Sequence, residues 1–105
     1  EVPSRGLGDV YKRQDMEFWT NNTKRLNLTS GGHFEPETNN NVNLGSTTKR
    51  FANVYTNDLN LSNKGSTNSV DNTWGDFTIQ EGESDLFLIN NRSGKKYKFN
   101  LTEVN

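Results

Sequence analysis

Apolar and polar residues alternate over three short segments near the C-terminus: "DFTIQ" (76–80), "DLFLIN" (85–90) and "KKYKFNLT" (95–102). The connectors "EGES" and "NRSG" are short and contain glycine, as the loops of β-hairpins do. The pattern therefore predicts a three-stranded antiparallel meander. Period-two alternation makes one face of this meander continuously apolar, and that face holds Phe77, Ile79, Leu86, Leu88, Tyr97, Phe99 and Leu101.

The middle segment of the meander is apolar on its other face as well. The loop lengths place Ile79 opposite Leu86, so that Phe87 and Ile89 project to the side that also carries Lys96. An isolated three-stranded sheet with one solvated face does not need apolar side chains on both sides. We therefore expect Phe87 and Ile89 to be covered by another subunit or by an upstream part of a longer protein.

One pattern recurs in the preceding residues, in "LNLTSGG", "VNLGST" and "LNLSNKG", where Leu28, Leu44 and Leu61 lie 16 and then 17 residues apart. Each copy is a short alternating run followed by turn residues. Such a period is typical of stacked units that cannot bury their apolar side alone, although an Asn-rich chain can also produce it by chance. For "NLGSTTKRFANVYTNDLNL" (43–61) we expect a strand, then a turn or a single helical turn, and then a strand over "NVYTNDLNL", because Asn and Thr are poor residues for a helix interior.

These patterns predict an all-β chain in three parts. Residues 15–72 form a repeat region of short strands and turns, and residues 73–105 form the C-terminal meander. Residues 1–14, "EVPSRGLGDVYKRQ", lack the Asn/Thr texture of the remainder and resemble the translated adapter-like sequence at the ends of some metagenomic gene predictions. We expect that segment to be non-native or a disordered leader without a function of its own.

Composition narrows the function classes. Only 29% of the 105 residues are hydrophobic, against roughly 45–50% in an average soluble domain counted with glycine. A thin core without disulfides, since cysteine is absent, makes oligomerisation a common route to stability. The net charge of −1 and the scattered basic residues do not favour nucleic-acid binding. No apolar run approaches the length of a membrane span, so we expect no membrane insertion.

Two groups of titratable residues are weak candidates for chemistry. His33 lies near Glu35 and Glu37, but a single chain has too few strong ligands there for a metal site. The acidic residues at 81, 83 and 85 fall in a predicted hairpin loop without an evident cleft, which suits a solvated turn better than glycoside hydrolysis. We expect no catalytic residue, no cofactor and no metal.

Trp19 and Trp74 are candidates for stacking on sugar rings. An aromatic side chain offers a flat apolar surface with a polar edge, and this combination suits a glycan as well as a protein interior. Trp74 precedes a predicted strand, where a tryptophan more often anchors a loop to the core.

The segment 43–61 resembles a recurring element of bacteriophage tail-fibre proteins. In that element a strand ending in "LGS" leads through a polar turn with a basic residue to an aromatic residue and an "N-V-Y" strand. The C-terminal "GDFTIQEGESDLFLINNRSGKKYKFNLTEV" also resembles the closing segment of fibre proteins from environmental, notably marine, phages. Phe51 stands where a tryptophan is common in the pattern. The matching positions are Leu44, Gly45, Ser46, Lys49, Arg50, Phe51, Asn53, Val54 and Tyr55.

The resemblance implies a structural virion component of a tail fibre. Such fibres are homotrimers of intertwined β structure that contact a host-surface glycan or protein receptor and join other tail proteins. Residues 15–72 would then be a fibre-like repeat, and trimerisation would complete the meander and cover Phe87 and Ile89. Two alternatives remain: a fragment of a glycan-cleaving tailspike, and a carbohydrate-binding or adhesin module of a bacterial surface protein.

Overall fold

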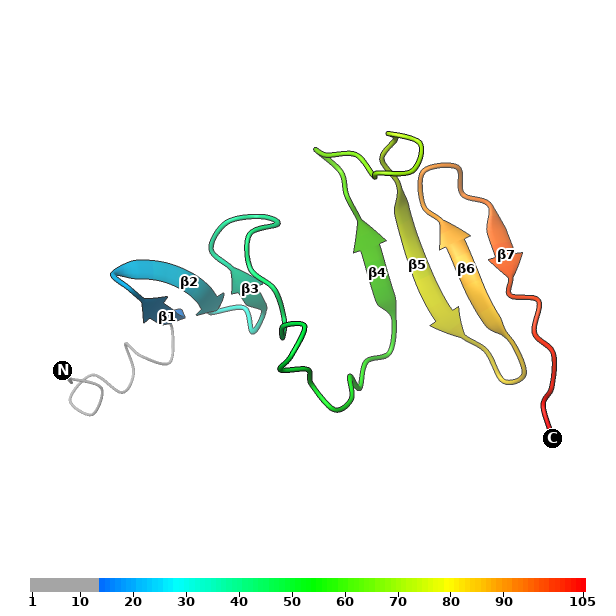
Figure 1. Ribbon diagram of the computed structural model, residues 1–105, viewed down its shortest axis with the longest axis horizontal. Coiled ribbons are helices and arrows are strands. Elements are labelled where there is room, and N and C mark those ends of the chain that lie inside the picture. Colours follow the sequence, from blue (N-terminus) through cyan, green and yellow to red (C-terminus); the bar gives the residue numbers. More distant parts are fainter. Residues whose placement is uncertain (1–13) are drawn as a thin grey trace. The chain divides into compact units, whose positions relative to one another are not determined.

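The computed structural model describes residues 14–105, so the expectation for residues 1–14 lies, apart from Gln14, outside the described residues. The chain divides into two compact units, with the boundary between Ala52 and Asn53. Each unit contains one antiparallel sheet, and residues 14–105 contain no helix (Figure 1). The prediction of an all-β chain is confirmed.

The N-terminal unit holds a three-stranded sheet of β1 (Met16–Thr20), β2 (Thr23–Leu28) and β3 (Phe34–Pro36), in that order. Asn21 and Asn22 form the loop between β1 and β2 and have φ angles of 52° and 56°. A two-residue hairpin loop of this kind needs positive φ at both positions, and asparagine tolerates it better than most residues. The pairing of β1 with β2 shifts register between Phe18 and Trp19.

The C-terminal unit holds a four-stranded sheet in which neighbours in sequence are neighbours in space. Its strands are β4 (Leu59–Ser62), β5 (Asp76–Glu81), β6 (Leu86–Asn90) and β7 (Lys96–Lys98). The predicted meander corresponds to β5, β6 and β7. Because β4 pairs with β5, the expected boundary at 72/73 falls between two strands of one sheet.

The predicted pairing of Ile79 with Leu86 is wrong, because Ile79 lies opposite Leu88. Gly82 N donates a hydrogen bond of 2.8 Å to Asp85 O, which makes residues 83 and 84 the two-residue loop, one position later than expected. As a result, each β5 residue pairs with a β6 residue two positions later in the sequence than predicted. Since side chains alternate with period two, the apolar residues still share one face as predicted.

Within 43–61 the expected turn forms, but the strands expected before Leu59 are absent, because a strand begins only at Leu59. Gly45 has a φ of 85°, and Ser46 N donates a hydrogen bond of 2.9 Å to Lys49 O, which closes a compact turn. Tyr55 is 92% exposed. An extended segment becomes a strand only beside a partner that takes up its backbone hydrogen bonds, and the described residues supply none here.

Two of the three repeated copies fold alike. "LNLTSGG" and "LNLSNKG" each end a strand, and each continues into a turn whose last glycine, Gly32 or Gly65, has a φ near 90°. The central asparagine of each copy bonds to a neighbouring segment, Asn27 to Glu37 and Asn60 to Thr78. The copy around Leu44 forms no strand, so the repeat pattern holds in part.

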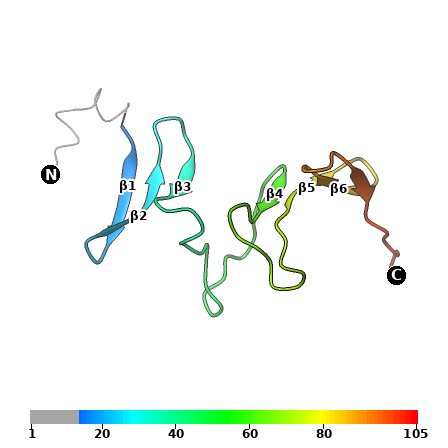
Figure 2. The same cartoon turned by 90° about the horizontal axis from the view of Figure 1, so that it is seen from above.

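Neither sheet is covered by a second layer within its own unit, as the view of the C-terminal unit from above shows (Figure 2). No apolar side chain is buried in residues 14–105, and the two buried residues, Asn27 and Thr78, are polar. A sheet normally buries one apolar face against another element. The described residues of each unit therefore lack the layer that would complete a hydrophobic core.

Candidate functional site

One face of the sheet in the C-terminal unit is apolar. Residues directly opposite in neighbouring antiparallel strands project to the same side, and Leu61 lies opposite Phe77 just as Leu59 lies opposite Ile79. Leu59 is 46% exposed and Leu61 is 51% exposed. We call this surface the apolar face, and it consists of Leu59, Leu61, Phe77, Ile79, Leu86, Leu88, Tyr97 and Phe99.

Sequence reasoning assigned the apolar face to β5, β6 and β7 but missed the contribution of β4. The alternating "LNL" of Leu59 to Leu61 carried the signal. Alternation shows which residues of one strand share a side, but not which other strand it joins. Adding β4 extends the face across all four strands of the sheet.

Phe87 and Ile89 lie on the opposite face of the same sheet. Phe87 is opposite Lys98 and Ile89 is opposite Lys96, so these apolar side chains border lysines as expected. With Gln80 and residues 96–98, they line a groove of about 370 Å³. Ile89 is half-buried, while Phe87 is 36% exposed. This face also carries a polar cluster around the buried Thr78, so it is less apolar than the other.

Trp74 is covered by a cation. The guanidinium carbon of Arg92 lies 3.8 Å from the centre of the Trp74 ring, and Arg92 Nη1 donates a hydrogen bond of 3.0 Å to the Trp74 carbonyl oxygen. The ammonium of Lys64 lies 5.8 Å from the same ring centre. A guanidinium stacked on an aromatic face is a favourable contact in its own right. The geometry supports loop anchoring for Trp74 rather than stacking on a sugar.

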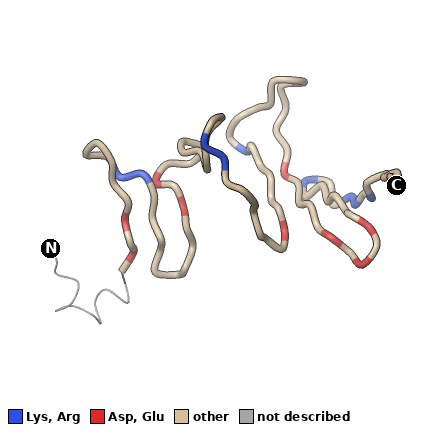
Figure 3. Tube along the Cα trace, turned by 60° about the horizontal axis from the view of Figure 1, so that its bottom comes forward, with Lys and Arg blue, Asp and Glu red and all other residues tan. Residues whose placement is uncertain are grey.

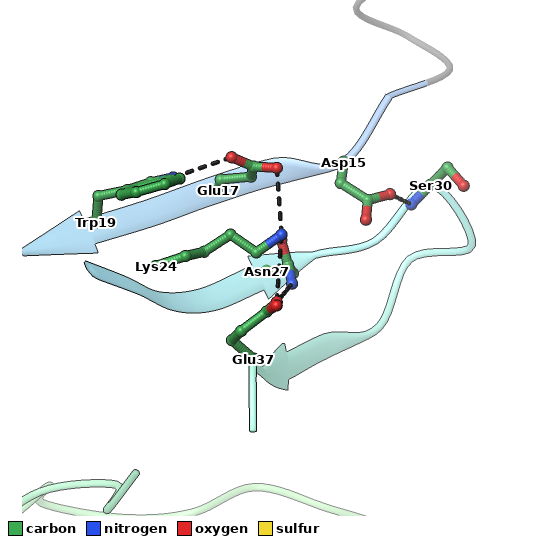
Figure 4. Close-up of polar contacts among 7 residues, drawn as sticks. All are labelled: Asp15, Glu17, Trp19, Lys24, Asn27, Ser30 and Glu37. Atoms are coloured by element: carbon green, nitrogen blue, oxygen red, sulfur yellow. Dashed lines mark hydrogen bonds and ion pairs between the residues drawn. The ribbon is translucent and has the colours of Figure 1, made fainter. Parts of the chain in front are cut away.

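Trp19 has a different environment, on β1 of the N-terminal sheet. Its side chain is 57% exposed, and its Nε1 donates a hydrogen bond of 2.9 Å to Glu17 Oε1 (Figure 4). The ammonium of Lys24 lies 3.3 Å from Glu17 Oε2 and 3.2 Å from Glu37 Oε1. Asn27 Nδ2 donates a further hydrogen bond of 3.0 Å to Glu37 Oε1. We call Glu17, Trp19, Lys24, Asn27 and Glu37 the Trp19 cluster.

Hydrogen bonds keep two members of the Trp19 cluster ionised over a wider pH range. The hydrogen bond from Trp19, followed by the one from Lys24, lowers the pKa of Glu17 below its ordinary value of 4.5. The hydrogen bond to Glu37, followed by that to Glu17, raises the pKa of Lys24 above its ordinary value of 10.5. Both groups favour their charged form because that form is hydrogen-bonded. The cluster is therefore charged at neutral pH.

The remaining candidate residues do not assemble into a site. His33 closes the turn between β2 and β3, where its backbone N donates to Thr29 Oγ1 at 3.0 Å, while Glu37 bonds to Lys24 and Asn27 instead. No group of three or more metal-ligating side chains is positioned to hold an ion in residues 14–105. The acidic residues at 81, 83 and 85 are exposed at the β5–β6 hairpin, and charged residues are otherwise dispersed along the trace (Figure 3).

Sequence reasoning singled out Trp19 and Glu37 separately, and it missed Glu17, Lys24 and Asn27. The signal was weak because their grouping depends on the register of three strands. Searches with protein-family models, curated proteins and solved structures found no match to the chain. Residues 14–105 contain no helix of the length and hydropathy that crossing a membrane requires.

Proposed function

We propose that this chain is a structural component of a phage tail fibre that associates with copies of itself through the apolar face. It takes part in host-surface attachment by multivalent binding rather than by catalysis, as part of the virion and beside other tail proteins. The sequence resemblance at 43–61 and 75–104 supports the fibre assignment. The uncovered apolar face is the observation that carries self-association.

A single-layer sheet with eight apolar side chains on one side leaves much apolar surface in contact with water when the chain is isolated. Complete burial of one leucine or phenylalanine side chain contributes roughly 1.5–3 kcal/mol. Leu59, Leu61 and Tyr97 are each about half exposed, so much of that stabilisation is not realised within the unit. Covering the face would supply the hydrophobic layer that the described residues lack.

A second copy of the chain suits this face. Its central positions carry no charge, so equivalent faces can meet around a symmetry axis without like-charge repulsion. In a homotrimer, each copy would contribute the same sheet to a shared core, and the groove around Phe87 and Ile89 would offer a second, smaller contact. Three joined chains also make weak receptor contacts effective through avidity.

The oligomeric state of the 105-residue chain tests the proposal, by sedimentation equilibrium and light scattering. Ile79→Lys on the apolar face and Ser84→Lys in the exposed β5–β6 loop form a matched pair, because each introduces one lysine at the same hairpin. We expect a wild-type trimer, which Ile79→Lys dissociates or unfolds because a lysine enters the shared core. Ser84→Lys should remain assembled, since Ser84 is exposed and lies neither on the apolar face nor in the groove around Phe87 and Ile89. A well-folded wild-type monomer would contradict the proposal.

A second candidate function is a monomeric carbohydrate-binding or adhesin module of a bacterial surface protein. The exposed ring of Trp19, with polar side chains around it, favours this candidate. Glycan binding by a stable monomer would select it over the fibre. Binding by an assembled trimer would agree with the fibre.

A further inference from the structure

We propose that the Trp19 cluster is a sugar-binding site that takes an uncharged or amino-substituted pyranose and rejects anionic sugars. This inference rests on the attachment role proposed above and names the chemistry of its receptor. All of its residues belong to the N-terminal unit, so it can be tested separately from the apolar face of the other unit.

The aromatic part of the site is held in one orientation. The hydrogen bond from Trp19 Nε1 to Glu17 fixes the indole edge, while the side chain stays 57% exposed. An exposed ring with its polar edge already satisfied offers its flat apolar surface to a ligand. The C–H groups on one side of a pyranose ring match that surface. At Trp74 a sugar would compete with Arg92, whose guanidinium already stacks on the ring.

The polar part of the site begins at the edge of that ring, where Glu17 accepts the indole hydrogen bond and Lys24 links Glu17 to Glu37. Glu17, Lys24 and Glu37 present acceptor and donor groups within one connected network (Figure 4). Sugar hydroxyl groups both donate and accept hydrogen bonds, and bonds that involve charged partners are the stronger ones. A pyranose stacked on Trp19 would therefore find acceptors in the two carboxylates and a donor in the ammonium.

A second, independent feature is the unused hydrogen-bonding capacity of Asn27. This residue is 9% exposed, its Nδ2 bonds to Glu37, and its Oδ1 has no hydrogen-bond donor. Buried polar atoms are rarely left without a partner, and one that is unpartnered calls for a water, an ion or a ligand. Because Oδ1 itself is shielded from solvent, a sugar hydroxyl reaches it only when a neighbouring side chain moves aside, after first contacts with the more exposed Glu17, Lys24 and Glu37.

The local charge selects among sugars. Glu17 on β1, Glu35 opposite Asn27 on β3, and Glu37 just after β3 contribute three carboxylates, against the Lys24 ammonium and the Arg25 guanidinium of β2. A uronic acid or sialic acid would bring another carboxylate into this field. A neutral pyranose avoids that repulsion, and a protonated amino sugar gains an attraction.

Two-dimensional NMR of the full chain tests the site, with the side-chain Nε1–H signals of Trp19 and Trp74 as reporters. The probes are a tetramer of N-acetylglucosamine, its deacetylated glucosamine form and a tetramer of galacturonic acid. We expect the Trp19 signal to shift with the first two probes and not with the third, while the Trp74 signal stays still. Trp19→Ala should weaken binding at least tenfold and Trp74→Ala should not.

Trp19→Phe keeps a ring, and Asn27→Leu removes the unpartnered acceptor together with the hydrogen bond to Glu37, so both variants address the site if Trp19→Ala fails to fold. We expect Trp19→Phe to retain part of the binding and Asn27→Leu to weaken it several-fold. The site proposal fails if no probe shifts Trp19 at millimolar concentration, or if the galacturonate tetramer binds best. Sedimentation of the same samples separates the two proposals. A trimer that binds none of the three sugars would contradict the sugar-binding site but not self-association through the apolar face.

Discussion

Thr78 Oγ1 donates a hydrogen bond of 2.6 Å to Asn60 Oδ1, and this bond joins β5 to β4 on the face opposite the apolar one. Thr78 also accepts a hydrogen bond of 2.9 Å from Asn91 Nδ2, which in turn donates to Asp76 Oδ1 at 3.0 Å. At 7% exposure, Thr78 is the most buried residue of the C-terminal unit. A polar cluster, not an apolar core, therefore marks the most protected point of this sheet.

The change Thr78→Val tests how much this polar cluster contributes to the free energy of unfolding. Valine has nearly the same shape but removes the two hydrogen bonds of the Thr78 hydroxyl, which together contribute about 1–3 kcal/mol at roughly 0.5–1.5 kcal/mol each. We expect the free energy of unfolding to fall by that amount in urea denaturation at one fixed protein concentration. Thr67→Val is the control, because the exposed hydroxyl of Thr67 bonds only to Asn72. An equal loss of unfolding free energy in both variants would contradict a stabilising role for the polar cluster around Thr78.

Gly82 allows Phe87 to fold back over the β5–β6 hairpin. A Cβ atom at position 82 would lie 2.7 Å from Phe87 Cε2, which is closer than two carbons can approach. We expect Gly82→Ala to displace the ring and to destabilise the chain by about 1 kcal/mol, as modest overpacking does. In a Phe87→Leu background, adding Gly82→Ala should cost much less stability, because the smaller side chain leaves room for the Cβ atom. Thermal unfolding of the wild type, the two single variants and the double variant measures this coupling.

The pKa of Glu17 reports the contact with Trp19. Because the indole hydrogen bond is the largest cause of the lowered pKa, Trp19→Phe should raise it toward the ordinary 4.5. A lowered carboxyl pKa adds stability above the unfolded value, and that contribution is lost as the pH falls below 4.5 through the folded pKa. Carboxyl carbon NMR of Glu17 follows this titration. The pH range from about 2 to 7 covers the values at which glutamate carboxyl groups ordinarily titrate. Trp74→Phe should leave the Glu17 pKa unchanged.

Arg92 shields the ring of Trp74 from solvent. In a Trp19→Phe background, Trp74 is the single tryptophan of the chain, so its fluorescence can be read alone. We expect Arg92→Ala to increase acrylamide quenching and to reduce the free energy of unfolding by about 0.5–1 kcal/mol, the usual value of an exposed cation–π contact. Arg50→Ala is the control, because Arg50 bonds to the Thr47 carbonyl in the other unit. Unchanged quenching in Arg92→Ala would show that the ring is not shielded.

Local pattern explains which of these relationships could be predicted from sequence. The side-chain alternation of Phe77 and Ile79 on β5 needs only the geometry of one strand, and the correct face followed from it. The partner of Ile79 depended on where the hairpin loop closes, and several loop positions are compatible with "EGES". The stretch before Leu59 resembled a strand, but strand formation requires a neighbour that the local sequence does not reveal.

The two tryptophans illustrate the same limit for the candidate site. The sequence offered both Trp19 and Trp74 as stacking candidates, with loop anchoring favoured for Trp74, and the structure placed Arg92 against the Trp74 ring and Glu17 at the edge of the Trp19 ring. Arg92 is 18 residues from Trp74 in sequence, and Glu37 is 20 residues from Glu17. Such contacts follow from strand pairing, so no local sequence motif predicts them.

The sequence by itself determined the all-β class, the C-terminal meander and the apolar alternation on β5 and β6, because hydrophobic period and turn chemistry are local properties. Only the tertiary structure decided that β4 joins this sheet, that the apolar face remains uncovered, and that Arg92 stacks on Trp74 while Trp19 stays 57% exposed. These outcomes depend on which distant segments pair, and pairing is chosen by the combined hydrogen bonds and burial of both partners.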